Sequence, residues 1–299
     1  MRISTRLALL SFAWPSALAA AQDSLQAVEI KSTRVAGPVY MLEGRGGNIG
    51  VSAGEDGLLM IDDQFAPLAE KIAAALKTIS ETGQLKFVLN THWHGDHTGG
   101  NAFFGRTATI IAHENVRTRL TTKQTLFGGE IEPLPKSGWP VITFDESLTI
   151  HFNGEPIQVL HLARSHTDGD SVILFKKSNV VHMGDNFFSG MFPFVDVDSG
   201  GSVEGMTRNV ARMLEELPAD VKIIPGHGPL STVAELKEFH RMLVATTDVV
   251  RQRVKAGQDL AAIQAEGLPE EWAPWGAGFI DTNRWIEIVV RSLEKDANG

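Results

Sequence analysis

The chain has 299 residues, of which 43% are hydrophobic and 21% are charged, and its formal net charge is −9. This balance is typical of a globular protein that is long enough for a large buried core. The acidic chain has no lysine- and arginine-rich block of the kind that neutralises phosphates, which argues against nucleic acid as a partner. It also has no cysteine, so a metal site must use imidazole and carboxylate ligands.

The first 21 residues, MRISTRLALLSFAWPSALAAA, have the features of a secretory signal peptide. Two arginines precede an apolar stretch that ends in small residues, and cleavage would follow Ala19 or Ala21. A proline interrupts the stretch, which falls short of the ~20 residues that a membrane span needs. The sequence therefore predicts export to the periplasm or the medium, no stable membrane span, and a single domain over residues 22–299.

Strands and helices alternate in the first half of the mature chain. Apolar alternation on both sides of a Gly-Glu-Asp-Gly turn indicates a pair of short strands. A segment that opens with a proline and has apolar residues at helical spacing predicts a surface helix, and a buried strand follows it. The expected strands are 37–44, 48–62, 85–90 and 107–112, and the expected helices are 67–80 and 113–124.

Strands dominate the next part of the chain, and helices return after it. Two strand-rich halves, each with helices, predict two sheets that pack face to face and are covered by helices outside. The expected strands are 141–144, 148–152, 156–162, 171–175 and 179–185, and the expected helices are 203–217, 232–256 and 282–295.

Residues 87–101, FVLNTHWHGDHTGGN, contain three of the chain's ten histidines directly after an apolar run. In an extended strand His92 and His94 share one face, and Asp96 suits the start of a helix. Zinc is commonly bound by neutral imidazoles and carboxylates, and its catalytic sites leave a position for water. A lone loop histidine is usually solvated, but three with an aspartate within six positions predict a metal site.

One loop cannot easily surround two metals, so further ligands must come from elsewhere. Three later stretches place a polar group at the end of an apolar run: His166 in VLHLARSHTDGDSVILF, Asp185 in VVHMGDNFF and His227 in VKIIPGHGPL. Strand ends followed by glycine-rich loops commonly display functional side chains. These three residues are therefore the candidates to complete the site.

Together the HWHGDH, SHTDGD, MGD and PGHG segments resemble the motifs of the metallo-β-lactamase superfamily, over nearly all of the mature chain. The resemblance implies an α/β fold, the αβ/βα four-layer sandwich, with a dinuclear site at one edge. The cofactors that it implies are two Zn²⁺ ions, and the same ligands also accept iron or manganese. It places His92, His94 and His166 at the first metal, Asp96, His97 and His227 at the second, and Asp185 between them as a bridge.

The fourth motif departs from that of the best-known zinc β-lactamases, which have a cysteine where this chain has Asp185. In this respect the chain is similar to glyoxalase II, lactonases and other hydrolases of the superfamily. The resemblance implies that a hydroxide bridging the two metals attacks the amide or ester carbonyl of a small-molecule acyl substrate. Asp96 would orient the hydroxide and is the expected catalytic residue.

The predicted function is that of an exported zinc-dependent hydrolase, and export favours a β-lactam substrate. The aspartate of the fourth motif leaves a lactone or a thioester open as the substrate. A mononuclear iron dioxygenase is the alternative from another class, because that branch of the superfamily has a similar first motif. A non-catalytic binding protein is disfavoured because no ligand is missing. The sequence does not determine the oligomeric state or the substrate contacts.

Several residues near the motifs are expected to support the site without binding metal. Asp62 or Asp63, at the end of an early strand, would brace the histidine loop. His113, His161 and His182 are expected to make structural hydrogen bonds, because the ligand set is complete without them. Residues 46–48 are expected to form a flexible turn over the metals, and Asn186 and Ser189 are candidate polar contacts to the substrate. Residues 125–140 and 186–201 are expected to be long loops, and either substrate contact or packing within these loops is open for Phe127, Trp139, Phe188 and Phe192.

Overall fold

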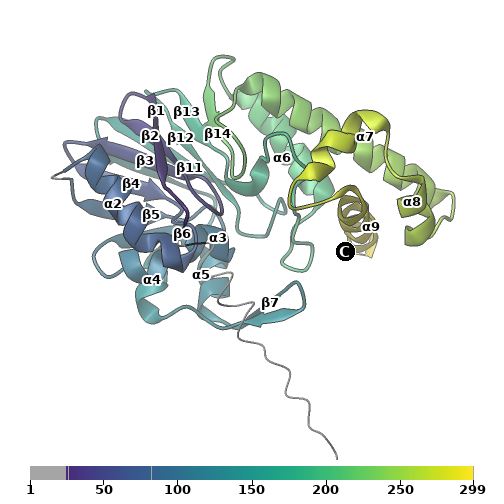
Figure 1. The fold of residues 1–299 in the computed structure, drawn as a ribbon, viewed down its shortest axis with the longest axis horizontal. Coiled ribbons are helices and arrows are strands. Elements are labelled where there is room, and N and C mark those ends of the chain that lie inside the picture. The colour runs from purple at the N-terminus through teal and green to yellow at the C-terminus, as the bar shows by residue number, and fades with distance from the viewer. Residues whose placement is uncertain (1–24, 26, 82, 299) are drawn as a thin grey trace, which may run out of the picture.

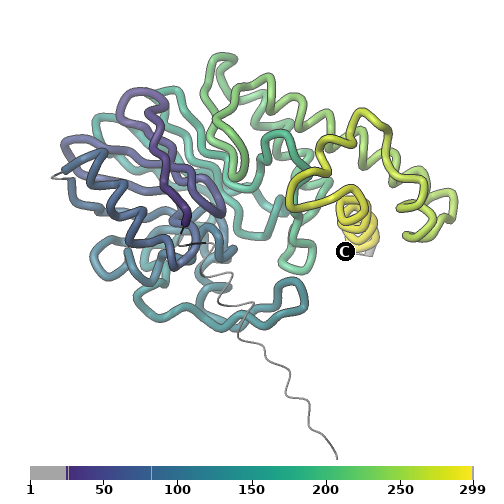
Figure 2. The backbone as a smooth tube through the Cα atoms, in the orientation of Figure 1, coloured from purple at the N-terminus to yellow at the C-terminus, as the bar shows by residue number. Residues whose placement is uncertain are grey.

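Two β-sheets lie face to face at the centre of the computed structural model, and helices cover their outer faces (Figures 1 and 2). The structure describes residues 25, 27–81 and 83–298, so the predicted signal peptide lies outside the described residues. Within them, no helix combines the length and the apolar character that crossing a membrane requires.

The first sheet has seven strands in the order β1-β2-β3-β4-β5-β6-β9 in the described part of the chain. Neighbours from β1 to β4 are antiparallel, and those from β4 to β9 are parallel. Parallel neighbours need crossover connections, which the helices after β4, β5 and β6 supply. The strands are β1 (Lys31–Ala36), β2 (Val39–Glu43), β3 (Ile49–Gly54), β4 (Gly57–Ile61), β5 (Leu85–Leu89), β6 (Thr109–His113) and β9 (Ile142–Phe144).

The second sheet has five strands in the order β10-β11-β12-β13-β14 among the described residues. Its pairs are antiparallel except β13–β14, which is parallel. A separate hairpin, β7–β8, stands between β6 and β9 along the chain. The strands are β10 (Ser147–Phe152), β11 (Glu155–His161), β12 (Ser171–Phe175), β13 (Val180–His182), β14 (Lys222–Ile224), β7 (Gln124–Leu126) and β8 (Gly129–Ile131).

Helices cover the two outer faces unequally. The helix α2 packs on the first sheet, whereas α6, α7 and α9 pack on the second. Figure 1 shows α6 to α9 gathered on the side away from α2. The helices are η1 (Ala66–Leu68), α2 (Ala69–Ile79), α3 (Gly95–Thr98), α4 (Asn101–Phe104), α5 (Glu114–Thr121), η2 (Lys136–Gly138), η3 (Gly184–Asn186), α6 (Val203–Glu216), α7 (Val233–Lys255), α8 (Leu260–Glu266), η4 (Glu270–Ala277) and α9 (Thr282–Asn298).

The alternation of side chains along β4 explains how one strand serves two cores. Leu59 and Ile61 face the second sheet, whereas Leu58 and Met60 lie under α2. Successive side chains of a strand point to opposite faces, so both faces of this strand are buried. The sequence of the strand, GLLMI, is accordingly apolar throughout, whereas a strand with one exposed face would alternate apolar and polar residues.

Capping residues mark where helices begin. Thr232 and Glu235 form a capping box at the start of α7. At the start of α5, His113 Nδ1 accepts a hydrogen bond from the backbone N–H of Asn115 at 3.2 Å. This contact gives His113 the structural role expected from the sequence.

The structure confirms the αβ/βα sandwich, and it differs from the sequence prediction in several local details, which include the unpredicted strands β1 and β14. Residues 142–144, which the sequence groups with the later strands, join the first sheet beside β6. The hairpin β7–β8 forms from residue 124, expected to end a helix, and residues 125–131, expected to lie in a loop. Residues 260–277, left without an element, contain α8 and η4. Local patterns indicate periodicity, but they do not say which distant strand a segment will pair with.

The turn between β10 and β11 is tied to the turn between β3 and β4 through Asn153. The backbone N–H of Asn153 donates to the Asp56 carboxylate at 2.6 Å. Its side-chain amide donates to Ser52 Oγ at 3.0 Å and to the Gly57 carbonyl at 3.1 Å. Its φ of 51° lies in the left-handed region, which asparagine tolerates better than most residues. One side chain thus links the two sheets at this end.

We expect Asn153→Ala to lower the free energy of unfolding by about 1–3 kcal/mol, because the amide hydrogen bonds are lost and alanine is strained at this φ. Urea denaturation followed by circular dichroism measures the change. Asn153→Gly is the matched control, since it removes the same hydrogen bonds but relieves the backbone strain, and it should cost less. An unchanged midpoint for the alanine variant would contradict the link.

Candidate metal centre

Seven acidic and imidazole side chains meet at one edge of the sandwich, in the loops that join or follow strands of both sheets. In each of two groups, the candidate ligand atoms all lie within 4.8 Å of one another. The structure thus brings together all seven residues that the sequence selected. The first group is His92, His94, His166 and Asp185, and the second is Asp96, His97 and His227.

The first group has the spacing of one coordination shell. His94 Nδ1 lies 3.1 Å from His92 Nε2 and 2.8 Å from His166 Nε2. Asp185 Oδ2 lies 3.4 Å from His166 Nε2 and 3.8 Å from His92 Nε2. Tetrahedral zinc with bonds of ~2.0–2.1 Å separates its ligand atoms by about 3.3 Å. These four side chains therefore fit a single metal ion without rearrangement.

The second group lies on the other side of Asp185. His227 Nε2 is 3.4 Å from Asp96 Oδ2 and 3.4 Å from His97 Nε2. Asp185 Oδ1 is 3.1 Å from His97 Nε2 and 3.4 Å from His227 Nε2. Because Oδ2 of the same carboxylate faces the first group, each oxygen of Asp185 faces one group. Asp185 thus lies between the two groups and contacts both of them.

Four of the imidazoles are oriented by contacts on their outer nitrogens. When an outer ring nitrogen carries the proton and donates it to a fixed oxygen, the inner nitrogen keeps its lone pair for a metal. The outer contacts are His92 Nδ1 to Thr91 Oγ1 (3.0 Å), His94 Nε2 to Asp196 Oδ2 (3.1 Å), His97 Nδ1 to Asp62 Oδ2 (2.7 Å) and His166 Nδ1 to the Phe194 carbonyl (2.7 Å).

Asp62 organises the histidine loop. Its carboxylate accepts hydrogen bonds from the backbone N–H and the hydroxyl of Thr91, both at 2.7 Å, in addition to its contact with His97. Asp62 is fully buried with a φ of 61°, a strained backbone conformation that these contacts hold in place. Asp63 instead accepts from the backbone N–H of Gly100 at 2.8 Å. The bracing role that the sequence left open between the two aspartates thus belongs to Asp62.

Asp196 is the supporting residue that sequence analysis did not select. It lies in the loop after η3, and its carboxylate contacts His94, which is 102 positions away along the chain. The backbone N–H of Ser199 also donates to this carboxylate at 3.1 Å. The acidic and glycine-rich segment VDVDSGG indicates a turn there, but nothing local in it indicates a histidine partner.

The charges of the two groups differ. Burial lowers the pKa of His166 to about 4 and that of His92 well below its usual value, so both imidazoles are neutral at pH 7 and can bind a metal. Burial also opposes protonation of His97, but the carboxylates of Asp185 and Asp96 raise its pKa well above the usual value. The carboxylates of Asp185 and Asp96 next to His97 therefore carry negative charge that a bound cation would balance.

Two glycines let the backbone approach the centre closely. A Cβ at Gly47 would lie 2.1 Å from Cε1 of His97, and one at Gly226 would lie 2.1 Å from Oδ1 of Asp185. The backbone N–H of Asn48 donates to the Gly226 carbonyl at 2.7 Å, which joins the two segments. Residues 46–48 therefore form a wall tied to the centre, whereas the sequence suggested a flexible turn over the metals.

Most of the side chains left open as substrate contacts pack within the protein. Phe188 stacks on the ring of His227, with ring centroids 5.0 Å apart. Ser189 accepts a hydrogen bond from the Ser231 hydroxyl at 2.9 Å, and Phe192 is buried in the core beneath the helices. Asn186 is also buried, and its amide donates to the Met183 carbonyl. Trp139 is half-buried, and its Nε1 donates to the Leu134 carbonyl.

The centre opens to solvent on the side of the second group. The side chains of Asp96 and His227 are 25% and 23% exposed, whereas that of Asp185 is 5% exposed. The remaining four histidines are buried. Asp96 and His227 are therefore the most exposed of the seven side chains.

Comparison with known proteins places this geometry in a family. The model of the metallo-β-lactamase superfamily matches residues 42–227. The metallo-β-lactamase type 2 of Bacteroides fragilis is 22% identical over 256 residues, 81% of this chain and 96% of that protein. The hydroxyacylglutathione hydrolase of Halorhodospira halophila is 30% identical over 190 residues, 64% of each chain. The solved metallo-β-lactamase from Pontibacter korlensis has a TM-score of 0.59 at 16% identity, over 72% of this chain and 99% of its own.

The family match and the geometry agree. The matched region covers more than half of the chain and contains all seven side chains of the two groups. Their imidazole and carboxylate donors suit divalent metal ions. We conclude that this protein is a member of the metallo-β-lactamase superfamily, a family of metal-dependent hydrolases, with a metal site built from histidine and aspartate.

Proposed function

We propose that the protein is an exported, zinc-dependent hydrolase of the β-lactamase type, which cleaves an amide or ester bond of a small acyl compound. The proposal rests on the position of Asp185. Each of its two oxygens faces one ligand group, which leaves a place for one metal ion on either side of the carboxylate. The similarity to the Bacteroides fragilis enzyme supports a β-lactam as the first substrate to test.

The protein's own residues have distinct parts in such a reaction. Two zinc ions would supply a water nucleophile that is active at neutral pH, and would polarise the carbonyl. Asp96 is placed to orient that nucleophile, because its carboxylate lies at the exposed edge of the centre, 3.4 Å from His227. Phe188 is buried and stacks on the ring of His227, which covers one face of that imidazole.

A lactone or thioester is the second candidate substrate. Asp185 occupies the position at which the sequence resemblance places a cysteine in the best-known zinc β-lactamases. Similarity to the hydroxyacylglutathione hydrolase of Halorhodospira halophila also favours this class. An iron dioxygenase with one metal ion would use only the first ligand group, and the complete second group argues against it.

The decisive experiment is turnover by the mature protein loaded with zinc. A chromogenic cephalosporin, a lactone and a glutathione thioester are assayed in parallel, each with and without a chelator. Chelator-sensitive opening of the cephalosporin supports β-lactamase activity, whereas cleavage of only the lactone or the thioester supports the second candidate. Metal analysis of natively expressed protein distinguishes zinc from iron, and fractionation of the cells tests export.

We expect His92→Ala to bind fewer metal ions per chain and to lose at least about a hundredfold in turnover, because it removes one imidazole from the first group. Elemental analysis and the same assay measure both effects. His151→Ala is the matched control, since His151 is exposed on β10 outside the two groups. Full activity of the His92 variant at full metal content would contradict the assignment.

We expect Asp196→Asn to weaken zinc binding roughly ten- to a hundredfold, because the carboxylate that orients His94 is lost. Competition with a chromogenic chelator measures the affinity without any assay of turnover. Asp220→Asn, which removes an exposed carboxylate between α6 and β14, is the control and should keep the affinity of the wild type. Equal affinities for all three proteins would show that Asp196 does not position His94.

A further inference from the structure

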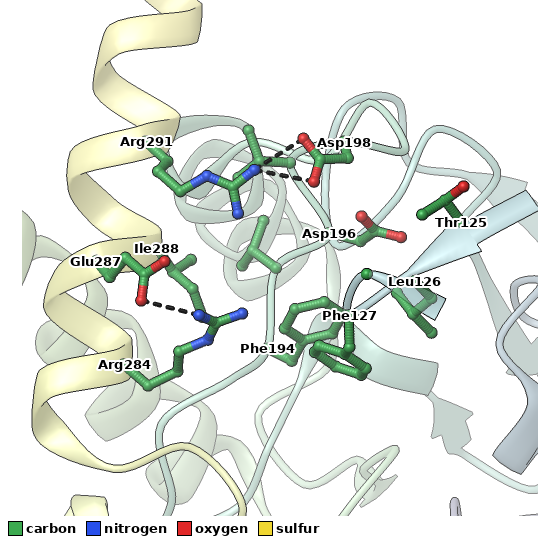
Figure 3. Close-up of a pocket in the computed structure, with 13 residues that line it drawn as sticks. Thr125, Leu126, Phe127, Phe194, Asp196, Asp198, Arg284, Glu287, Ile288 and Arg291 are labelled. Atoms are coloured by element: carbon green, nitrogen blue, oxygen red, sulfur yellow. Dashed lines mark hydrogen bonds and ion pairs between the residues drawn. The ribbon is translucent and has the colours of Figure 1, made fainter. Parts of the chain in front are cut away.

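A cavity of about 320 Å³ lies beside the metal centre, bounded by α9, the β7–β8 hairpin and the loop after η3 (Figure 3). Its volume is in the range of small-molecule sites, and charged side chains of α9 and of the loop line it together with apolar ones. The residues that line it include Phe127 on the hairpin, Phe194 on the loop, and Arg284, Glu287, Ile288 and Arg291 on α9.

The cavity and the metal centre share a wall. The carbonyl of Phe194 accepts the hydrogen bond of His166, and its ring lies 5.7 Å from the ring of His94 between centroids. Asp196, which contacts His94 on one side, also lines the cavity. A molecule in the cavity therefore lies within one side chain of the groups that would hold the metals.

Aromatic rings gather at this cavity although solvent can reach them. Phe127 is 56% exposed and Phe279 is 78% exposed, and their ring centroids lie 5.9 Å apart. The ring of Phe127 also lies 4.8 Å from that of Phe194. Exposed aromatic rings in contact with one another are uncommon on a soluble surface and mark places where a ligand or a partner binds. Here they adjoin a cavity of ligand size.

Arg284 contributes a positive charge that its neighbours only partly satisfy. Figure 3 shows its guanidinium extending from α9 toward Phe194. Nη1 donates to Glu287 at 2.8 Å, and among the described residues no hydrogen bond engages Nε or Nη2. Arg291 differs, because its Nη2 donates to both oxygens of Asp198 at 2.8 and 2.9 Å. Arg291 therefore holds the loop, and Arg284 is the group with free donors.

We propose that this cavity is the specificity pocket of the hydrolase and takes an acyl substrate with a carboxylate and an aromatic or branched apolar group. The carboxylate binds to the free donors of Arg284, since a guanidinium pairs with a carboxylate through two parallel hydrogen bonds. The apolar group packs against the rings of Phe127 and Phe194, beside Ile288. This inference rests on the proposed function for turnover, although binding to the pocket does not require turnover.

Binding is tested first, with two probes that contain no amide or ester bond. Zinc-loaded protein is titrated calorimetrically with 3-phenylpropanoate and with the neutral ketone 4-phenylbutan-2-one. The wild type should prefer the carboxylate by roughly ten- to a hundredfold, and Arg284→Gln should lose that preference. Arg212→Gln removes another exposed, ion-paired arginine, from α6, and should keep the preference. Phe127→Ala should weaken binding of both probes by a similar factor, because it removes the shared apolar contact.

Turnover is then compared for the mono-p-nitrophenyl ester of 3-phenylglutarate and for its neutral methyl ester. The wild type should have the higher kcat/KM for the anionic ester, and Arg284→Gln should reduce this ratio toward one while thermal unfolding shows the fold intact. A carboxylate preference that survives in Arg284→Gln in both experiments overturns the pocket. If Arg284→Gln loses the carboxylate preference in the binding experiment, the pocket is supported. If neither ester shows chelator-sensitive turnover, the proposed hydrolase function is overturned while the pocket stands.

Discussion

A buried carboxylate shared by two groups of imidazoles is the constraint on which the rest of this structure depends. Asp185 is almost completely buried, and it faces His97 and His227 with one oxygen and His92 and His166 with the other. Such a charge is tolerated in the interior only where opposite charge or hydrogen bonds compensate it. The close approach of Gly226, where any Cβ would strike the carboxylate, follows from the same crowding.

The surrounding structure holds these groups at the expense of local strain. Asp62 and Gln64 both have positive φ values directly after β4, although neither is a glycine. Their side chains bind the two segments that adjoin the centre, Asp62 the histidine loop and Gln64 the carbonyl of Gly47 at 2.8 Å. A strained backbone conformation of this kind is retained only where the surrounding contacts hold the residue in place. The core between the two sheets supplies the rigidity that keeps them there.

The metal centre and the proposed pocket come from different parts of the chain. The region that matches the superfamily ends at His227, whereas α7, α8 and α9 follow it. The cavity joins Phe194, inside the matched region, to Arg284 on α9, outside it. A superfamily fold can thus keep one set of ligands while C-terminal helices shape what reaches them, since function is determined by the site and not by the fold alone.

The sequence by itself determined the four-layer fold and the seven residues of the centre, because strand periodicity and the polar residues at strand ends are local patterns. It did not reveal that Asp196 supports His94, or that Arg284 lies across a cavity from Phe127. Nor did it separate Gly47, where a Cβ would strike His97, from Gly95, which has open space around it. Only the tertiary structure decided these points, because each depends on contacts between segments far apart in the chain, and local sequence does not encode such contacts.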